Sequence, residues 1–257
     1  MSFKTAAFGA FLAGSCLLSA QTASAEQWTR KSFLMPEGSF EITGDPARPA
    51  MVGLNASRGS FGDPLTLAPH FYWAASDDLS LGISHERGIC IGDNCGDRVY
   101  NDAGFDLMYF LTGSPTFELD LHAGIPVSSL YDPLILGIRA GVIGRVNLGR
   151  ITALVFDPSI YVGITNRGAP HNNGQGIDLP FWFYFQATEV VVPFVGSALS
   201  GPFDEFTDQF VMPLEGGVLF DVARNVDVGF SLRFHNLIGR HGSADWRSLY
   251  FLGRFRF

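Results

Sequence analysis

The sequence predicts an all-β fold: a single antiparallel transmembrane β-barrel of about twelve strands. Three observations predict it. Many segments of about ten residues alternate apolar and polar side chains, and that length crosses a bilayer at the tilt of a barrel strand. The chain is 47% hydrophobic, yet no stretch after residue 25 offers the roughly 18 consecutive apolar residues of a transmembrane helix. Short and long connections alternate along the chain, which is typical of barrels with short periplasmic turns and longer external loops.

Residues 1–25 have the features of a cleaved signal peptide. One basic residue, Lys4, precedes an apolar run over residues 6–20, and Ala23-Ser24-Ala25 is the small-residue pattern that signal peptidase cleaves. Cleavage would leave Glu26 as the first mature residue. An exported apolar chain without a transmembrane helix can satisfy its backbone hydrogen bonds in lipid by closing a barrel.

The next segment, residues 26–48, is predicted as a periplasmic N-terminal extension or plug, with a partial strand as a further alternative. Residues 49–257 are predicted as the barrel. Period-two alternation gives about twelve segments, and because strand boundaries are the least determined feature, about ten to fourteen strands fit. The segments are 49–57, 65–75, 79–88, 100–111, 116–126, 134–146, 150–163, 179–187, 189–200, 210–222, 226–236 and 246–257.

The connections between these segments fall into two classes. Tight turns rich in Gly, Asn, Asp and Pro are expected at 76–78, 112–115, 147–149, 188 and 223–225. Longer connections are expected at 58–64, 89–99, 127–133, 164–178, 201–209 and 237–245. Asp157-Pro158 interrupts the seventh segment and predicts a bulge or bend there.

The alternation assigns one face of each strand to lipid and the other to the lumen. In 116–126, Leu119 falls on the lipid face, and Glu118 and Asp120 fall on the lumen face. In 100–111, Phe105 faces lipid and Asp106 faces the lumen. A charge on the lipid face near the midplane would cost ~2–4 kcal/mol. Nearly every charge within a predicted strand falls on the polar face, which supports this register.

The last strand carries a specific resemblance. It places Leu249, Phe251, Phe255 and Phe257 on one face and ends on an aromatic residue. With Gly253, about one position later than the usual spacing, it resembles the C-terminal assembly signal of Gram-negative outer-membrane β-barrel proteins. That resemblance implies a porin-like barrel in the cell outer membrane. It also implies outer-membrane lipid, lipopolysaccharide and the barrel-assembly machinery as partners.

Charged side chains on the lumen face are the candidate functional residues. Rings of such side chains discriminate permeating solutes by charge, and the candidates for a constriction are Asp106, Asp120, His122, Arg139, Glu215 and Arg233. Opposite charges on neighbouring strands favour cross-strand pairs, and the candidate pairs are Glu118 with Arg145 and Asp227 with Arg254. Because acids and arginines are mixed around the lumen, the sequence predicts weak ion selectivity.

Three functions fit this pattern. The first is a narrow porin-like channel for the passive passage of small polar solutes. The second is a non-conducting structural or interaction barrel whose lumen is filled by salt bridges. The third is a membrane-embedded lipid hydrolase, which needs a nucleophile beside a histidine. Ser84-His85-Glu86 is the nearest match, but in a strand His85 points away from Ser84. We therefore predict a non-enzyme with no catalytic residue.

The remaining features concern covalent and bound groups. Cys90 and Cys95 lie in one predicted external loop, and an oxidising compartment favours a disulfide between them. This loop supplies too few ligands for a metal site, and we predict no metal and no cofactor. Acidic residues outnumber basic ones by 25 to 17, which argues against nucleic acid as a partner.

Overall fold

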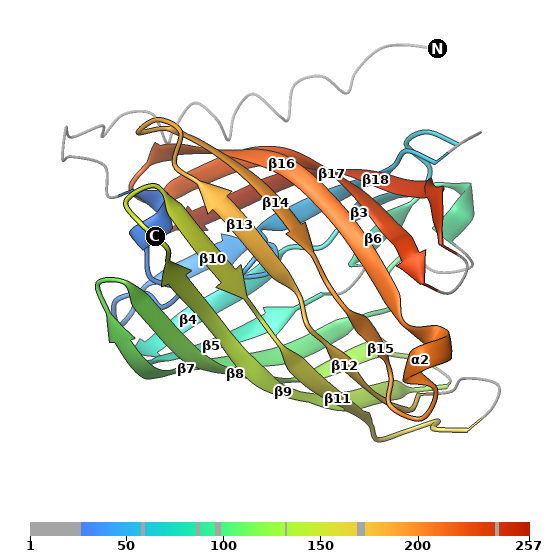
Figure 1. The fold of residues 1–257 in the computed structure, drawn as a ribbon. Helices are drawn as coiled ribbons and strands as arrows, with labels where there is room; N and C mark the ends of the chain where they lie inside the picture. Colours follow the sequence, from blue (N-terminus) through green and yellow to red (C-terminus); the bar gives the residue numbers. More distant parts are fainter. Residues whose placement is uncertain are drawn as a thin grey trace, which may run out of the picture.

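The structure is a computed structural model that describes residues 27–57, 60–85, 88–95, 99–131, 133–168, 173–239 and 242–257. The predicted signal peptide and Glu86 lie outside these ranges. Within the described ranges, no helix is long and apolar enough to cross a membrane. All the strands join one antiparallel sheet that closes into a barrel (Figure 1), so the predicted fold class is confirmed.

Strands form most of the described chain. They are β1 (Phe40–Thr43), β2 (Ala50–Asn55), β3 (Leu65–Leu67), β4 (His70–Ser76), β5 (Leu79–Ser84), β6 (Ile89–Ile91), β7 (Ala103–Ser114), β8 (Phe117–Ser129), β9 (Ile135–Asn147), β10 (Thr152–Phe156), β11 (Ser159–Gly163), β12 (Gln175–Asp178), β13 (Phe181–Phe185), β14 (Val191–Ser197), β15 (Ser200–Pro202), β16 (Val211–Ala223), β17 (Val226–Gly239) and β18 (Ser243–Arg256). The helical turns are η1 (Trp28–Arg30), η2 (Asp93–Cys95) and α2 (Phe206–Gln209).

These segments make a wall of 12 strands in the part of the chain that the structure describes. Six wall strands each consist of two consecutive segments: β1 and β2, β3 and β4, β5 and β6, β10 and β11, β12 and β13, and β14 and β15. The predicted interruption of the seventh strand is observed, because β10 ends and β11 begins on either side of Asp157-Pro158. The eighth wall strand begins at Gln175, earlier than predicted, because β12 pairs with β11.

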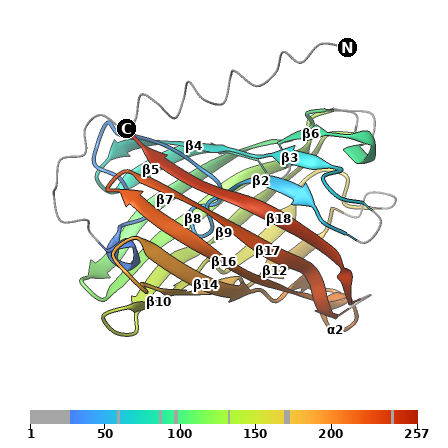
Figure 2. The same cartoon turned by 90° about the horizontal axis from the view of Figure 1, so that it is seen from above.

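The barrel closes where the last strand meets the first. Tyr250 of β18 lies opposite Gly53 of β2, and Arg256 lies opposite Glu41 of β1. Figure 2 shows β18 beside β2 along this seam. Among the described strands, closure leaves no unpaired sheet edge, which is the condition for placing strands in lipid.

The first wall strand is interrupted by residues 44–49, here called the inward loop. β1 pairs with β18 and β4, and β2 pairs with β18 and β3. The wall therefore begins at Phe40, inside the segment 26–48 that the sequence predicts as an extension, a plug or a partial strand. The inward loop leaves the wall between these two strands and enters the lumen.

Side chains alternate between an apolar exterior and a polar interior. Phe105, Phe230 and Phe251 are exposed on the outside, whereas Asp106 and Glu118 are buried inside. The predicted faces of β7 and β8 are thus confirmed. An exterior of this kind suits lipid and would be unfavourable in water, which supports the predicted location in the outer membrane.

The two ends of the barrel differ. The turn end carries the short turns and the C-terminus, and the loop end carries α2 and the longer connections (Figure 1). The predicted disulfide between Cys90 and Cys95 is present at the loop end, with the two Cα atoms 5.6 Å apart. In the predicted orientation, the turn end is periplasmic and the loop end is external.

Candidate functional site

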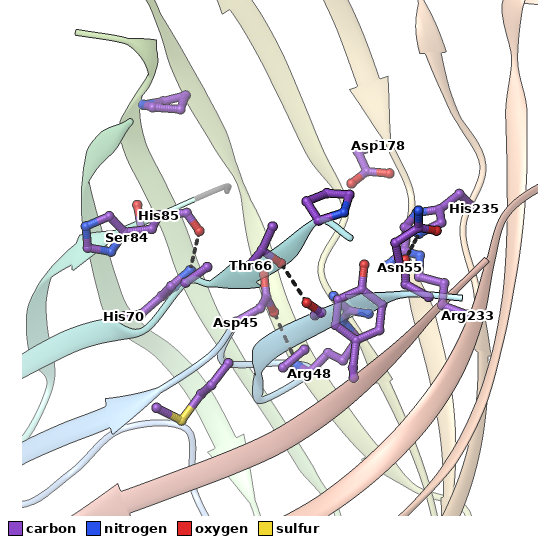
Figure 3. Close-up of a pocket in the computed structure, with 18 of the residues that line it drawn as sticks. Asp45, Arg48, Asn55, Thr66, His70, Ser84, His85, Asp178, Arg233 and His235 are labelled. Carbon is purple, nitrogen blue, oxygen red and sulfur yellow. Dashed lines mark hydrogen bonds between the residues drawn. The ribbon is translucent and has the colours of Figure 1, made fainter. Parts of the chain in front are cut away.

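The half of the lumen nearest the loop end contains a cavity of about 620 Å³. A smaller cavity of about 120 Å³ adjoins it. Both are lined by the same five charged residues, here called the charged cluster: Asp45, Arg48, Arg139, Asp178 and Arg233. Figure 3 shows Asp45 and Arg48 of the inward loop between His70 on one side and Arg233 on the other. The charged cluster therefore lies at the boundary between the two cavities.

The sequence Gly44-Asp-Pro-Ala-Arg-Pro49 explains why the chain turns inward here. Asp and Pro are favoured turn residues, and the Arg48 amide donates to the Asp45 carbonyl at 3.0 Å. The Asp45 carboxylate also accepts a hydrogen bond from the Ala47 amide at 2.9 Å. The two ends of the loop meet at Gly44 and Ala50, here called the neck. A Cβ on Gly44 would collide with the backbone of Ala50. Only glycine allows the two ends of the loop to approach this closely.

The inward loop is fixed to distant parts of the wall. The Tyr184 hydroxyl on β13 donates to the Ala47 carbonyl at 2.9 Å, although β18, β17, β16 and β14 lie between β13 and β2. Arg48 Nη1 lies 2.8 Å from Glu215 Oε2 on β16. The loop therefore crosses much of the lumen, and these bonds hold it in a defined position.

Arginines and acids in this region differ in exposure. The Arg139 side chain is 27% exposed and its partner Asp106, at 3.1 Å, is 1% exposed. Arg233 is 26% exposed, and the Glu215 carboxylate, 3.8 Å away, is 3% exposed. Asp106 lines neither cavity and Glu215 lines only the smaller one, so in the larger cavity the arginines are the exposed members of these pairs. Asp45 and Asp178 also line the cavity and offset part of the positive charge.

Aromatic rings form another part of the cavity wall. The Arg48 guanidinium carbon lies 4.6 Å from the centre of the Tyr250 ring, a cation–π contact that fixes the arginine. The rings of His235 and Trp246 are stacked with their centres 4.9 Å apart. His235 Nε2 also lies 2.8 Å from the Ser248 hydroxyl. Flat rings beside fixed charges suit solutes that combine an apolar ring face with polar groups.

The structure divides the predicted constriction residues into two groups. Arg139 and Arg233 line both cavities, Glu215 lines the smaller one, and Asp106 lines neither. His122 instead bonds to Asp157, with Nδ1 2.9 Å from Oδ1, and both are buried. Asp120 is also buried, and neither of its carboxylate oxygens has a hydrogen-bond partner among the described residues.

The predicted lumen pairs lie towards the turn end. Glu118 and Arg145 are opposite each other in register, and their side chains are 2.7 Å apart. Asp227 is likewise opposite Arg254, but its carboxylate lies 2.9 Å from Lys31 Nζ. Residues of the predicted assembly signal lie on or directly after β18: Gly253, Phe255 and Phe257.

Sequence reasoning missed the residues that the N-terminal part contributes to the lumen. Lys31, Asp45 and Arg48 come from the segment 26–48, which has no strand periodicity that would assign its side chains to a face. The run of turn residues at 44–49 is a signal for a loop, but it does not give the loop's direction. Asp178 was placed in a connection, whereas it ends β12.

The structure does not favour the hydrolase alternative. Both ring nitrogens of His85 are occupied: Nδ1 lies 2.6 Å from the Pro69 carbonyl and Nε2 lies 2.9 Å from the Tyr100 hydroxyl. His85 is therefore held by partners other than Ser84. Among the described residues, no group of three or more His, Cys, Asp or Glu side chains could hold a metal ion.

The fold is similar to solved porin structures. The KdgM porin matches with a TM-score of 0.53 and 9% identity, covering 85% of this chain and 98% of that chain. The KdgM porin in complex with disordered oligogalacturonate matches with a TM-score of 0.55 and 8% identity, covering 85% of this chain and 98% of that chain. The NanC porin matches with a TM-score of 0.57 and 6% identity, covering 79% of this chain and 97% of that chain. No family model and no curated protein matches the sequence. At these identities the likeness establishes the fold alone.

Proposed function

We propose that the protein is an outer-membrane channel that passes small polar solutes and favours anionic ones. The observation that carries this proposal is the arrangement of charges at the boundary between the two cavities. There, Arg48, Arg139 and Arg233 line the larger cavity, whereas their acidic partners Glu215 and Asp106 are buried and do not line it.

The preference for anions revises the weak selectivity expected from the sequence. A count of charges around the lumen treats every acid and every arginine as equally accessible. A solute interacts most strongly with the charges it can approach, because water and salt screen the others. Three arginines and two aspartates line the larger cavity, so a modest preference for anions is expected.

The aromatic wall extends the proposal to the shape of the solute. Tyr250 and Trp246 offer ring faces next to the Arg48 and Arg233 guanidinium groups. A small saccharide with a carboxylate fits both features, because sugar rings pack on aromatic rings and carboxylates bind guanidinium groups in a forked geometry. One solved structure with this fold holds oligogalacturonate, a ligand of that chemical class.

Ion selectivity in a planar bilayer tests the proposal. In a potassium chloride gradient, the refolded mature protein should give a reversal potential whose sign shows that chloride permeates more readily than potassium. Galacturonate added on the loop side should reduce the current more than neutral galactose does. A reversal potential whose sign shows that potassium permeates more readily, or equal block by the two sugars, would contradict the proposal.

The proposal also covers the surroundings of the barrel. Outer-membrane lipid and lipopolysaccharide would contact the apolar exterior, and the assembly machinery would bind the last strand, which ends on the exposed Phe257. Assembly of a Phe257→Ser variant into cell membranes tests this second point. Assembly at the wild-type level would contradict it.

A further inference from the structure

The N-terminal segment, residues 27–35, lies in the half of the lumen nearest the turn end. Figure 1 shows the blue chain before β1 at the end of the barrel where the C-terminus lies. Trp28, Lys31, Phe33 and Met35 are each at most 5% exposed. The Trp28 ring packs on the ring of Tyr184, with the centres 4.2 Å apart. These contacts place the segment inside the barrel.

The segment's contacts involve widely separated strands. Lys31 Nζ lies 2.7 Å from Asp221 Oδ1 on β16 and 2.9 Å from Asp227 Oδ1 on β17. On β8, the Glu118 carboxylate accepts a hydrogen bond from the Phe33 amide at 2.9 Å. Because β14, β13 and the segments β10 and β9 separate β16 from β8 along the wall, the segment spans the lumen.

The wall charges around the segment are shielded from water. Glu118, Asp120, Asp221, Asp227 and Arg254 all point inward and are at most 6% exposed. In an open pore of this polarity, such side chains would be hydrated. Their burial means that the segment fills the cross-section at this level.

Contacts that involve side chains, rather than strand pairing, hold residues 27–35 against the barrel wall. Within the described residues, the first backbone–backbone hydrogen bond between this part of the chain and the wall is that from the Gly38 amide to the Ala74 carbonyl, at 2.9 Å. Departure of residues 27–35 would therefore leave the pairing of β1 intact. It would also expose Asp120 and the Oδ2 atom of Asp221, which have no hydrogen-bond partner among the described residues. Hydration of these buried oxygens would offset part of the lost contacts.

We propose that residues 27–35 are a displaceable gate, anchored by Lys31 between Asp221 and Asp227, and that solutes pass only when the segment leaves the lumen. This inference rests on the proposed channel function. In this proposal, solutes enter through the two cavities at the loop end. The pore opens and closes in the half of the lumen nearest the turn end.

Single-channel recording of the full mature chain tests the gate. Lys31→Glu should raise the open probability about tenfold or more, because it replaces two charge-assisted hydrogen bonds with repulsion. Arg30→Glu is the matched control. It makes the same charge change one residue earlier, where the side chain is exposed, and should stay within about twofold of wild type. Lys31→Gln serves as a milder second variant, should the glutamate variant fail to fold.

A labelling experiment follows the segment without relying on current. Thr29 is buried, and the disulfide leaves no free thiol among the described cysteines. In a Thr29→Cys background, Lys31→Glu should make a soluble maleimide react about tenfold or more faster. Equal labelling rates and equal open probabilities in wild type and both Lys31 variants would overturn the gate and leave the channel standing. Faster labelling with no current from any folded variant would support displacement of the segment and contradict the channel.

Discussion

The Arg48 guanidinium lies 2.8 Å from the Glu215 carboxylate, although the two residues are 167 positions apart in the sequence. This contact joins the inward loop to β16 and places a positive charge where the two cavities meet. Because Arg48 is partly exposed and Glu215 is buried, the pair presents its positive member to the solute.

Opposite substitutions in this pair should change selectivity in opposite directions. Arg48→Gln should lower the preference for chloride and Glu215→Gln should raise it, because one removes the positive charge and the other removes its counter-charge. A unit charge at about 4 Å in water is worth about 1 kcal/mol, so the permeability ratio should change by up to about fivefold. Reversal potentials in a salt gradient provide the measurement.

The matched control for these substitutions is Arg150→Gln. Arg150 is an exposed arginine between β9 and β10 at the turn end. Its loss should change selectivity less than the loss of Arg48. If all three variants keep the wild-type ratio, the charged cluster does not set selectivity.

The neck of the inward loop should not tolerate a larger residue at position 44. A Cβ there meets the backbone of Ala50, so Gly44→Ala should force the two ends of the loop apart. The expected loss of unfolding free energy is about 1–3 kcal/mol, as for other overpacked sites. Urea unfolding in detergent micelles measures it, and Gly149→Ala, where a Cβ meets nothing within 4 Å, is the control. An equal effect of the two substitutions would contradict this description of the neck.

Loss of Arg139 should destabilise the barrel through its partner. Asp106 is buried, lies 3.1 Å from Arg139 Nη2 and accepts a hydrogen bond from the Tyr72 hydroxyl at 3.1 Å. Removing one member of a buried ion pair costs up to about 3–5 kcal/mol, because the other charge is left buried. Arg139→Met should therefore cost more than the double variant Asp106→Asn/Arg139→Met in the same unfolding assay. Equal costs would show that the Asp106 charge is not desolvated.

The disulfide at the loop end should be complete in the mature protein. Thiol titration of the unfolded, non-reduced protein should find no reactive Cys90 or Cys95. Both cysteines lie outside the lumen cavities, so the double variant Cys90→Ser/Cys95→Ser should keep the wild-type conductance. Two reactive thiols in the wild-type protein would contradict the pairing.

The architecture was predictable because a barrel in lipid imposes a period of two on every strand. Phe105 and Asp106, which are neighbours in the sequence, lie on opposite faces of β7 as predicted. The interruption at Asp157-Pro158 was predictable from the missing amide of proline. The disulfide followed from two close cysteines in an exported chain.

The candidate site was less predictable because the inward loop at its centre has no alternation of apolar and polar residues. Arg48 and Asp45 lie on a loop, and nothing in their spacing says that the loop enters the lumen instead of solvent. Lys31 contacts residues 190 and 196 positions away, a tertiary relationship that no local pattern encodes. His122 was expected near Asp106 and Arg139, but its partner Asp157 became visible only with the bend between β10 and β11.

Single-channel recording of the refolded mature protein beside its Lys31→Glu variant tests the gated channel most directly. We predict discrete conductance steps of the same size in both proteins, with chloride preference and a higher open probability in the variant. Absence of steps in both, from protein shown to be folded by its heat-dependent electrophoretic mobility, would contradict a channel. It would favour a closed structural barrel.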